Sequence, residues 1–220
     1  MDHSEGLGRV VLASGNAGKL REMQALLAST GIELIAQGTL GVPDAPEPFG
    51  TFIENALAKA RHASRLTGLP ALADDSGICV RALGGAPGVR SARYASIDSS
   101  APRSDADNNA RLVRELAGST DRSALFYCVL VLLRHADDPQ PLIADGAWQG
   151  AFIDTPRGAG GFGYDPHFWL PDLGLTASEL DAQTKNRLSH RAQAMQSLLQ
   201  KVGAAQSSGT TGQARSGAGG

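Results

Sequence analysis

A short apolar run leads into a glycine-containing turn in Val10-Val11-Leu12-Ala13-Ser14-Gly15-Asn16-Ala17-Gly18-Lys19. Residues 20–27 follow with the composition of a helix, so the stretch predicts a strand, a turn and a helix in succession. The first turn of a helix presents free backbone N–H groups and the positive end of the helix dipole, which together suit an anion. Lys19 adds a mobile cation that can reach a phosphate. The stretch predicts a phosphate-binding turn, although a plain strand–turn–helix with a surface lysine explains it equally well.

Composition and short motifs exclude several classes of protein. The turn is not the phosphate loop of the common ATPases, which has two more residues between its glycines and a Ser or Thr after the Lys. The formal net charge of −2 argues against a non-specific nucleic-acid binder, so we expect no nucleic-acid partner. The longest apolar run, residues 124–133, is too short to span a membrane. Cys79 and Cys128 lie in apolar runs, as reduced thiols of a cytoplasmic protein do.

Helical and extended patterns alternate along the chain, which predicts an α/β fold with a mixed sheet. We expect one domain over residues 9–202, a flexible leader over 1–8 and a disordered Gly/Ser/Ala tail over 203–220. Helices are predicted near 19–28, from a capping box at Thr51, over 104–116 and from a cap at Ser189. The predicted strands lie near residues 9–14, 33–36, 70–73, 78–80, 123–133, 141–148 and 151–153.

Two adjacent carboxylates, Asp74 and Asp75, follow the apolar run 70–73. Carboxylates at the end of a strand suit a hard divalent cation such as Mg²⁺. Alternation along a strand points them to opposite faces, and a turn expected at Ser76-Gly77 favours Asp75 as the residue that reaches the metal. An Asp-Ser-Gly turn held by bonds from side chain to backbone is the simpler interpretation of the same residues.

A glycine-rich loop over 158–163 matches the spacing G-x-G-x-x-G, but Pro166 and aromatic residues follow where a dinucleotide-binding loop requires a helix. The loop instead presents Phe162, Tyr164 and Asp165, an aromatic face and an acceptor that suit a flat heterocycle. Packing is the alternative role for these aromatic residues.

Basic residues near residue 190 surround the start of the last predicted helix. Lys185, His190 and Arg191 lie before or within its first turn. Cations there oppose the helix dipole, which indicates a role other than helix stabilisation. A helix cap followed by solvated basic residues is the alternative.

The order of these motifs resembles that of a known family, the non-canonical purine nucleoside triphosphate pyrophosphatases, or inosine triphosphatase family. The resemblance extends over residues 9–202 as an inosine triphosphatase-like domain. The motifs that carry it are Ser14-Gly15-Asn16-x-x-Lys19, Thr51-Phe52-x-Glu54-Asn55-Ala56-x-x-Lys59-Ala60, Ala73-Asp74-Asp75-Ser76-Gly77, Leu83-Gly84-Gly85-Ala86-Pro87-Gly88-x-x-Ser91-Ala92-Arg93-Tyr94, Gly161-Phe162-Gly163-Tyr164-Asp165-Pro166 and Ser189-His190-Arg191.

The resemblance implies a homodimer of two-lobed α/β subunits, with a long mixed sheet and a nucleotide cleft between the lobes. It implies Mg²⁺-dependent hydrolysis of ITP, dITP and XTP to the monophosphate and pyrophosphate. Asp75 would serve the metal and activate water. The residues implied to hold the triphosphate are Ser14, Gly15, Asn16, Ala17, Gly18 and Lys19, with Ser76 beside Asp75. Those implied to hold the base and sugar are Phe162, Gly163, Tyr164, Asp165, Lys185, His190 and Arg191.

One departure concerns the metal site. Relatives usually carry an acidic pair before the Thr51 motif, whereas this chain reads Pro46-Glu47-Pro48-Phe49-Gly50, which leaves Glu47 as the candidate second ligand. Three alternative functions remain open. They are a sister pyrophosphatase acting on modified pyrimidine triphosphates, a nucleotide-binding sensor without turnover, and an RNA-binding module, which the acidic balance disfavours.

Overall fold

A computed structural model of the chain describes the backbone of residues 7–97 and 102–210 and the side chains of all of these up to residue 204. One mixed sheet forms its centre, with strands in the order β2-β1-β3-β4-β5-β6-β7. β1 pairs in parallel with β2 and β3, and the other neighbours are antiparallel. The strands are β1 (Arg9–Leu12), β2 (Glu33–Ala36), β3 (Ala71–Val80), β4 (Ser123–Leu133), β5 (Leu142–Phe152), β6 (Phe168–Leu170) and β7 (Leu175–Thr176). The predicted α/β class with a mixed sheet is confirmed.

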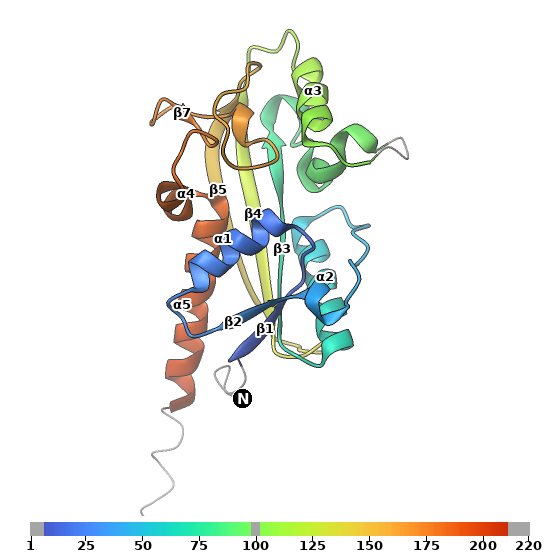
Figure 1. The fold of residues 1–220 in the computed structure, drawn as a ribbon, viewed down its shortest axis with the longest axis vertical. Coiled ribbons are helices and arrows are strands. Elements are labelled where there is room, and N and C mark those ends of the chain that lie inside the picture. Colours follow the sequence, from blue (N-terminus) through green and yellow to red (C-terminus); the bar gives the residue numbers. More distant parts are fainter. Residues whose placement is uncertain (1–6, 98–101, 211–220) are drawn as a thin grey trace, which may run out of the picture.

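Helices flank this sheet, and the predicted caps are present. Thr51, Ser104 and Ser189 each accept a hydrogen bond from a backbone N–H three residues later. In Figure 1, α1 and α5 lie against one face of the sheet, α2 covers the other, and α3 lies at the upper end. The helices are α1 (Ala17–Leu27), α2 (Phe52–Thr67), α3 (Asp105–Glu115), α4 (Ala182–Leu188) and α5 (His190–Thr210). Sequence patterns did not predict α4. In the part of the chain that the structure describes, each helix is too short or too polar to cross a bilayer.

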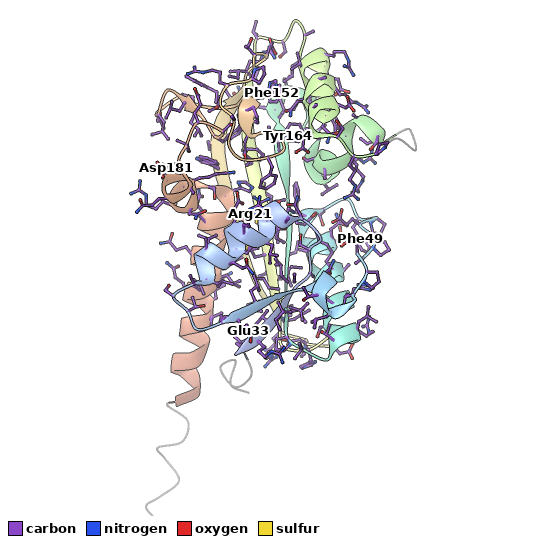
Figure 2. All side chains as sticks on the ribbon, viewed as in Figure 1. Arg21, Glu33, Phe49, Phe152, Tyr164 and Asp181 are labelled. Carbon is purple, nitrogen blue, oxygen red and sulfur yellow. The ribbon has the colours of Figure 1, made fainter. Side chains whose placement is uncertain are left out.

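Long strands β3, β4 and β5 run through two lobes, each with its own core. In the lower lobe, alternate residues of β3 face opposite helices: Leu72 packs with α1 and α5, and Ala73 with α2. The upper core gathers around Phe152 and Phe168, with Leu112 from α3. Figure 2 shows Phe152 and Tyr164 in this upper lobe, above α1. The site described below lies where the lobes meet.

The structure corrects the prediction for the middle of β3. A break at Asp74–Gly77 was expected, but β3 continues through these residues and pairs with β4 from Ala71 to Val80. Gly77 serves close packing here, because a Cβ at this position would lie 2.4 Å from the carbonyl oxygen of Gly88 and from Ser91 Oγ. The strand pattern predicted in two pieces over 141–153 is likewise one strand, β5.

Both predicted chain ends need adjustment. Leu7, expected in a flexible leader, is 8% exposed and belongs to the lower core. The last helix was expected to end near Val202, with disorder from 203, but α5 continues to Thr210. Alanine and glutamine at 204–206 are good helix formers, so they extend the helix past the apolar stripe. The remaining parts of both predictions, residues 1–6 and 211–220, lie outside the described residues.

Candidate active site

A cleft of about 650 Å³ lies between the lobes. A smaller cavity of about 100 Å³ adjoins it and shares four of its lining residues, Asn16, Lys19, Ser76 and Ala92. Charged side chains make up seven of the 18 residues that line the cleft, whereas the smaller cavity has the rings of Phe126, Phe162 and His190 in its wall. An elongated ligand with one charged end and one flat end would fit across the shared residues.

The turn after β1 forms one wall of the cleft. Ser14, Gly15, Asn16 and Lys19 line the cleft, whereas Ala17 and Gly18 form the first turn of α1 and do not. Asn16 Oδ1 accepts hydrogen bonds from the backbone N–H groups of Gly18, at 2.8 Å, and Lys19, at 3.1 Å. The N–H groups expected to be free for an anion are therefore capped by Asn16. An incoming phosphate would have to compete with the Asn16 side chain for them.

Asp74 and Asp75 point to opposite faces of β3, as strand alternation requires. Asp74 is 1% exposed and lies on the side of α1 and α5. Its carboxylate is 2.7 Å from Lys19 Nζ and 3.1 Å from Arg191 Nε, and it accepts a hydrogen bond from Ser76 Oγ at 3.0 Å. Burial alone would raise the pKa of Asp74, but the nearby charges of Lys19 and Arg191 hold this pKa well below its usual range. Asp74 therefore joins α1, through Lys19, to α5, through Arg191.

Asp75 lines the cleft and belongs to a second charged group, on the side of α2. Lys59 Nζ lies 2.9 Å from Asp75 Oδ1 and 2.9 Å from Glu47 Oε1. Asn55 Nδ2 donates to the other oxygen of Asp75 at 3.3 Å. Burial raises the pKa of Asp75 above its usual value, and the charge of Lys59 only partly opposes this. A carboxylate of raised basicity facing a cleft is suited to accept a proton.

The residues around Lys59 also bear on metal binding. No group of three or more His, Cys, Asp or Glu side chains suitable for a metal occurs among the described residues. Glu47 and Asp75 nevertheless share one cation, the Lys59 ammonium. Mg²⁺ is commonly held by one or two carboxylates together with substrate phosphates and water, so these two residues fit such a cation if Lys59 moves aside.

Two cations from two helices lie at the smaller cavity: Arg191 of α5 lines it, whereas Lys185 of α4 does not line it and instead contacts two residues that do, Asp165 and Phe162. Lys185 Nζ lies 2.7 Å from Asp165 Oδ2 and 3.0 Å from Glu22 Oε1. Arg191 donates to Glu22 at 2.7 Å and to Ser76 Oγ at 2.8 Å. The ring centroid of Phe162 is 5.2 Å from Lys185 Nζ and 5.4 Å from Arg191 Cζ. The cavity therefore combines an aromatic face with N–H donors held in place by carboxylates.

Of the other residues predicted for this cavity, His190 contributes a ring to the wall, and Gly163 and Tyr164 hold the glycine-rich loop in place. His190 stacks on Phe126 with ring centroids 4.8 Å apart, and its Nδ1 has no hydrogen-bond partner within the described part of the chain. Burial, reinforced by the Arg191 charge, holds the pKa of His190 well below its usual value, so the ring is neutral. Tyr164 donates through its hydroxyl to the Ser91 carbonyl at 2.8 Å, and the Gly163 N–H donates to Asp105. Tyr164 and Gly163 therefore fix the loop.

Sequence reasoning assigned no role to Lys59, Asn55, Glu22 or Arg93, which complete both charged groups. The signal for two of them was present in the helix predicted from Thr51. Asn55 and Lys59 are four residues apart and fall on the same face as Ala56 and Ala60. Polar side chains on an apolar helix face need buried partners, which here are Asp75 and Glu47.

Residues 10–201 match the Ham1 family. The chain belongs to the Ham1 family. Among curated relatives, a dITP/XTP pyrophosphatase from Ralstonia nicotianae is 66% identical over 194 residues, 88% of this chain and 96% of the relative. A dITP/XTP pyrophosphatase from Burkholderia pseudomallei is 62% identical and covers 89% of this chain and 93% of its own length.

Solved structures show the same fold. A HAM1 protein from Coxiella burnetii superposes with a TM-score of 0.81 at 48% identity, covering 89% of this chain and 98% of that protein. The likeness spans both lobes and the cleft between them, because the match covers nearly all described residues. As a member of the Ham1 family, the chain is therefore similar to its relatives in fold as well as in sequence.

Proposed function

We propose that this Ham1-family chain hydrolyses ITP, dITP and XTP to the nucleoside monophosphate and pyrophosphate, thereby removing these nucleotides from the cellular pool. The observation that carries the proposal is the adjoining pair of cavities, one charged around Asp75 and one aromatic around Phe162. High identity to proteins named dITP/XTP pyrophosphatase supports it.

Phosphates of the substrate would lie along the turn after β1. We assign the triphosphate to Ser14, Gly15, Asn16 and Lys19, with Ala17 and Gly18 contributing through the first turn of α1. Ser76 lines both cavities, so it suits the junction between sugar and phosphates. The Lys19 ammonium already lies beside this junction, where it is paired with Asp74.

Glu47 and Asp75 are the residues proposed to hold Mg²⁺, since both carboxylates now face the same cation, Lys59. When bound, Mg²⁺ would neutralise charge on the phosphates during the reaction. Lys59 lines the same cleft, so its ammonium, once displaced from the two carboxylates, would be available to a phosphate oxygen. Both cations would then act on the same end of the substrate.

Asp75 is the proposed general base. A water oxygen forms a bond to the α-phosphorus while one of its protons passes to Asp75. The bond from the α-phosphorus to the bridging oxygen breaks, and its electron pair leaves with pyrophosphate. Asp75 faces the cleft, and in the metal-free site burial raises the pKa of its carboxyl group, which favours proton acceptance there.

The smaller cavity would select the base. Phe162 can stack on a purine, and His190, Asp165, Tyr164 and Gly163 shape the remaining wall. Arg191 lines this cavity, and Lys185 contacts its lining residues Asp165 and Phe162. As donors, both would pair with the 6-oxo group of hypoxanthine or xanthine and oppose the 6-amino donor of adenine. A buried donor left without an acceptor weakens binding of the wrong base.

The resemblance to the family also supports a cytoplasmic homodimer. Gel filtration with light scattering would test the dimer by comparing the mass in solution with twice 22.8 kDa.

The products test the reaction. Wild-type protein should release one pyrophosphate and one monophosphate from each ITP, and a chelator should stop the release. Orthophosphate as the released product would contradict cleavage at the α-phosphorus. Turnover confined to modified pyrimidine triphosphates would indicate the sister activity, and binding without turnover would indicate a sensor.

A further inference from the structure

Arg93 is a charged residue of the cleft that the proposed reaction does not yet use. It lies in the helical segment Gly88–Ser96, in which its own backbone departs from helical geometry with φ −133° and ψ 23°. Its guanidinium donates to Glu47 Oε2 at 3.0 Å and to the Glu47 carbonyl oxygen at 3.1 Å. The side chain is 27% exposed, so it borders the cleft and keeps access to a ligand.

The position of Arg93 along the cleft indicates which part of a nucleotide it meets. Phe162 and His190 line the smaller cavity but not the cleft, whereas Arg93 lines the cleft but not the smaller cavity. A chain of ion pairs then runs from Asp75 through Lys59 to Glu47 and ends at Arg93. With a base in the smaller cavity and the α-phosphate near Asp75, the outer two phosphates would lie in the cleft, whose wall includes Arg93.

The contacts of the Arg93 guanidinium with Glu47 resemble those that an arginine makes with a phosphate group. Two separate nitrogens of the guanidinium bind two oxygens, one from the Glu47 side chain and one from its backbone. Arginine presents such paired donors in a fixed fork, which matches two oxygens of a phosphate group. If Glu47 turns to a metal ion, the Arg93 fork loses a carboxylate partner and becomes available to another anion.

We propose that Arg93 binds the β- and γ-phosphates and holds the pyrophosphate leaving group. The proposal rests on the proposed pyrophosphatase reaction and adds a substrate-contacting residue to it. As the bond to the α-phosphorus breaks, negative charge grows on the pyrophosphate, and the guanidinium lies where it would stabilise that charge.

Product binding separates this role from a structural one. Calorimetry at saturating Mg²⁺ would compare inorganic pyrophosphate with inosine monophosphate for wild type, Arg93→Ala and Arg93→Lys. Loss of charge-assisted hydrogen bonds should weaken pyrophosphate binding about tenfold or more in Arg93→Ala and leave monophosphate binding within about twofold. Arg93→Lys keeps the charge but lacks the paired donors, so its pyrophosphate affinity should lie between those of wild type and Arg93→Ala. If the alanine variant fails to fold, the comparison of Arg93→Lys with wild type replaces it.

Arg90→Ala is the matched control, because Arg90 lies in the same segment, is exposed and does not line the cleft. Its pyrophosphate affinity should equal that of wild type. Equal losses of affinity for both products in Arg93→Ala, or unchanged pyrophosphate affinity at this saturating Mg²⁺, would overturn the proposal, since Arg93 would then act at most through the loop of Glu47. Failure of wild type to hydrolyse ITP would instead count against the proposed function itself.

Discussion

Neighbouring carboxylates in this site have opposite pKa shifts because they face different surroundings. Asp74 is enclosed by Lys19 and Arg191, which stabilise its charge and hold its pKa low. Asp75 has one close cation, Lys59, and burial raises its pKa. Such a separation of pKa values typically assigns one carboxylate to structure and the other to proton transfer.

Asp75→Asn should abolish turnover and leave substrate binding largely intact. The amide keeps the shape of the side chain but loses the basicity needed to accept a proton from water. A general base typically contributes about 10²–10⁴-fold to the rate. Single-turnover kinetics with ITP, together with calorimetric binding, would measure both effects. A variant that retained more than about a tenth of wild-type kcat would contradict this role.

The raised pKa of Asp75 predicts how kcat/KM falls at low pH. A base must be ionised, so kcat/KM should fall as pH drops through a pKa above the value of about 3.9 for a free aspartate. Titration of the Asp75 carboxyl carbon by NMR, assigned with the Asp75→Asn spectrum, gives this pKa without relying on kinetics. A midpoint at or below that of a free aspartate would show that burial does not dominate here.

At the scale of elements, β3 is the strand that joins the two charged groups. Asp74→Ala should lower the free energy of unfolding by about 3–5 kcal/mol, because Lys19 and Arg191 would lose their shared buried partner. Asp74→Asn, which keeps the shape and can still accept hydrogen bonds, should cost less. Urea unfolding would measure both variants. Equal stability of Asp74→Ala and wild type would mean that these charges are well solvated.

Close packing at Gly77 gives a second test of β3. A side chain there meets Ser91 Oγ and the Gly88 carbonyl, so Gly77→Ala should destabilise the fold by about 1–3 kcal/mol. Gly38→Ala is the matched control, since a Cβ at Gly38 meets nothing within 4 Å. It should change stability by no more than about 0.5 kcal/mol. Similar melting temperatures for the two variants would show that the segment at Gly88 can shift to accommodate a methyl group at little cost in stability.

Sequence patterns predicted elements well where periodicity was uninterrupted. The strand predicted over 123–133 is β4 to the residue, and the helix capped by Ser104 is α3. The break predicted at Asp74–Gly77 was wrong, although these residue types often form turns. Here they lie inside a strand, because Asp75 forms an ion pair with Lys59 and Gly77 leaves room for the Gly88 backbone. Local sequence does not reveal such tertiary partners.

On the scale of the whole molecule, the site exists only because distant segments meet between the lobes. Lys19, Glu47, Lys59, Asp75 and Arg191 come from separate segments of the chain, and ion pairs link them to one another or to Asp74. The resemblance indicated Lys19, Asp75 and Arg191 as site residues and left Glu47 as the candidate second metal ligand. Lys59 could not be assigned a role from spacing alone, because its partner carboxylates are 12 and 16 residues away.

Discrimination between ITP and ATP is the sharpest test of the proposed function, because it requires both cavities to act on one substrate. Pyrophosphate release should be measured for both nucleotides under identical Mg²⁺ concentrations and reported as the ratio of kcat/KM. Donors from Lys185 and Arg191 facing a 6-oxo group predict a preference for ITP that can reach about 10⁴-fold. Turnover of ATP within about tenfold of ITP would contradict the account, since a cavity built around the 6-oxo group could not accept adenine so readily.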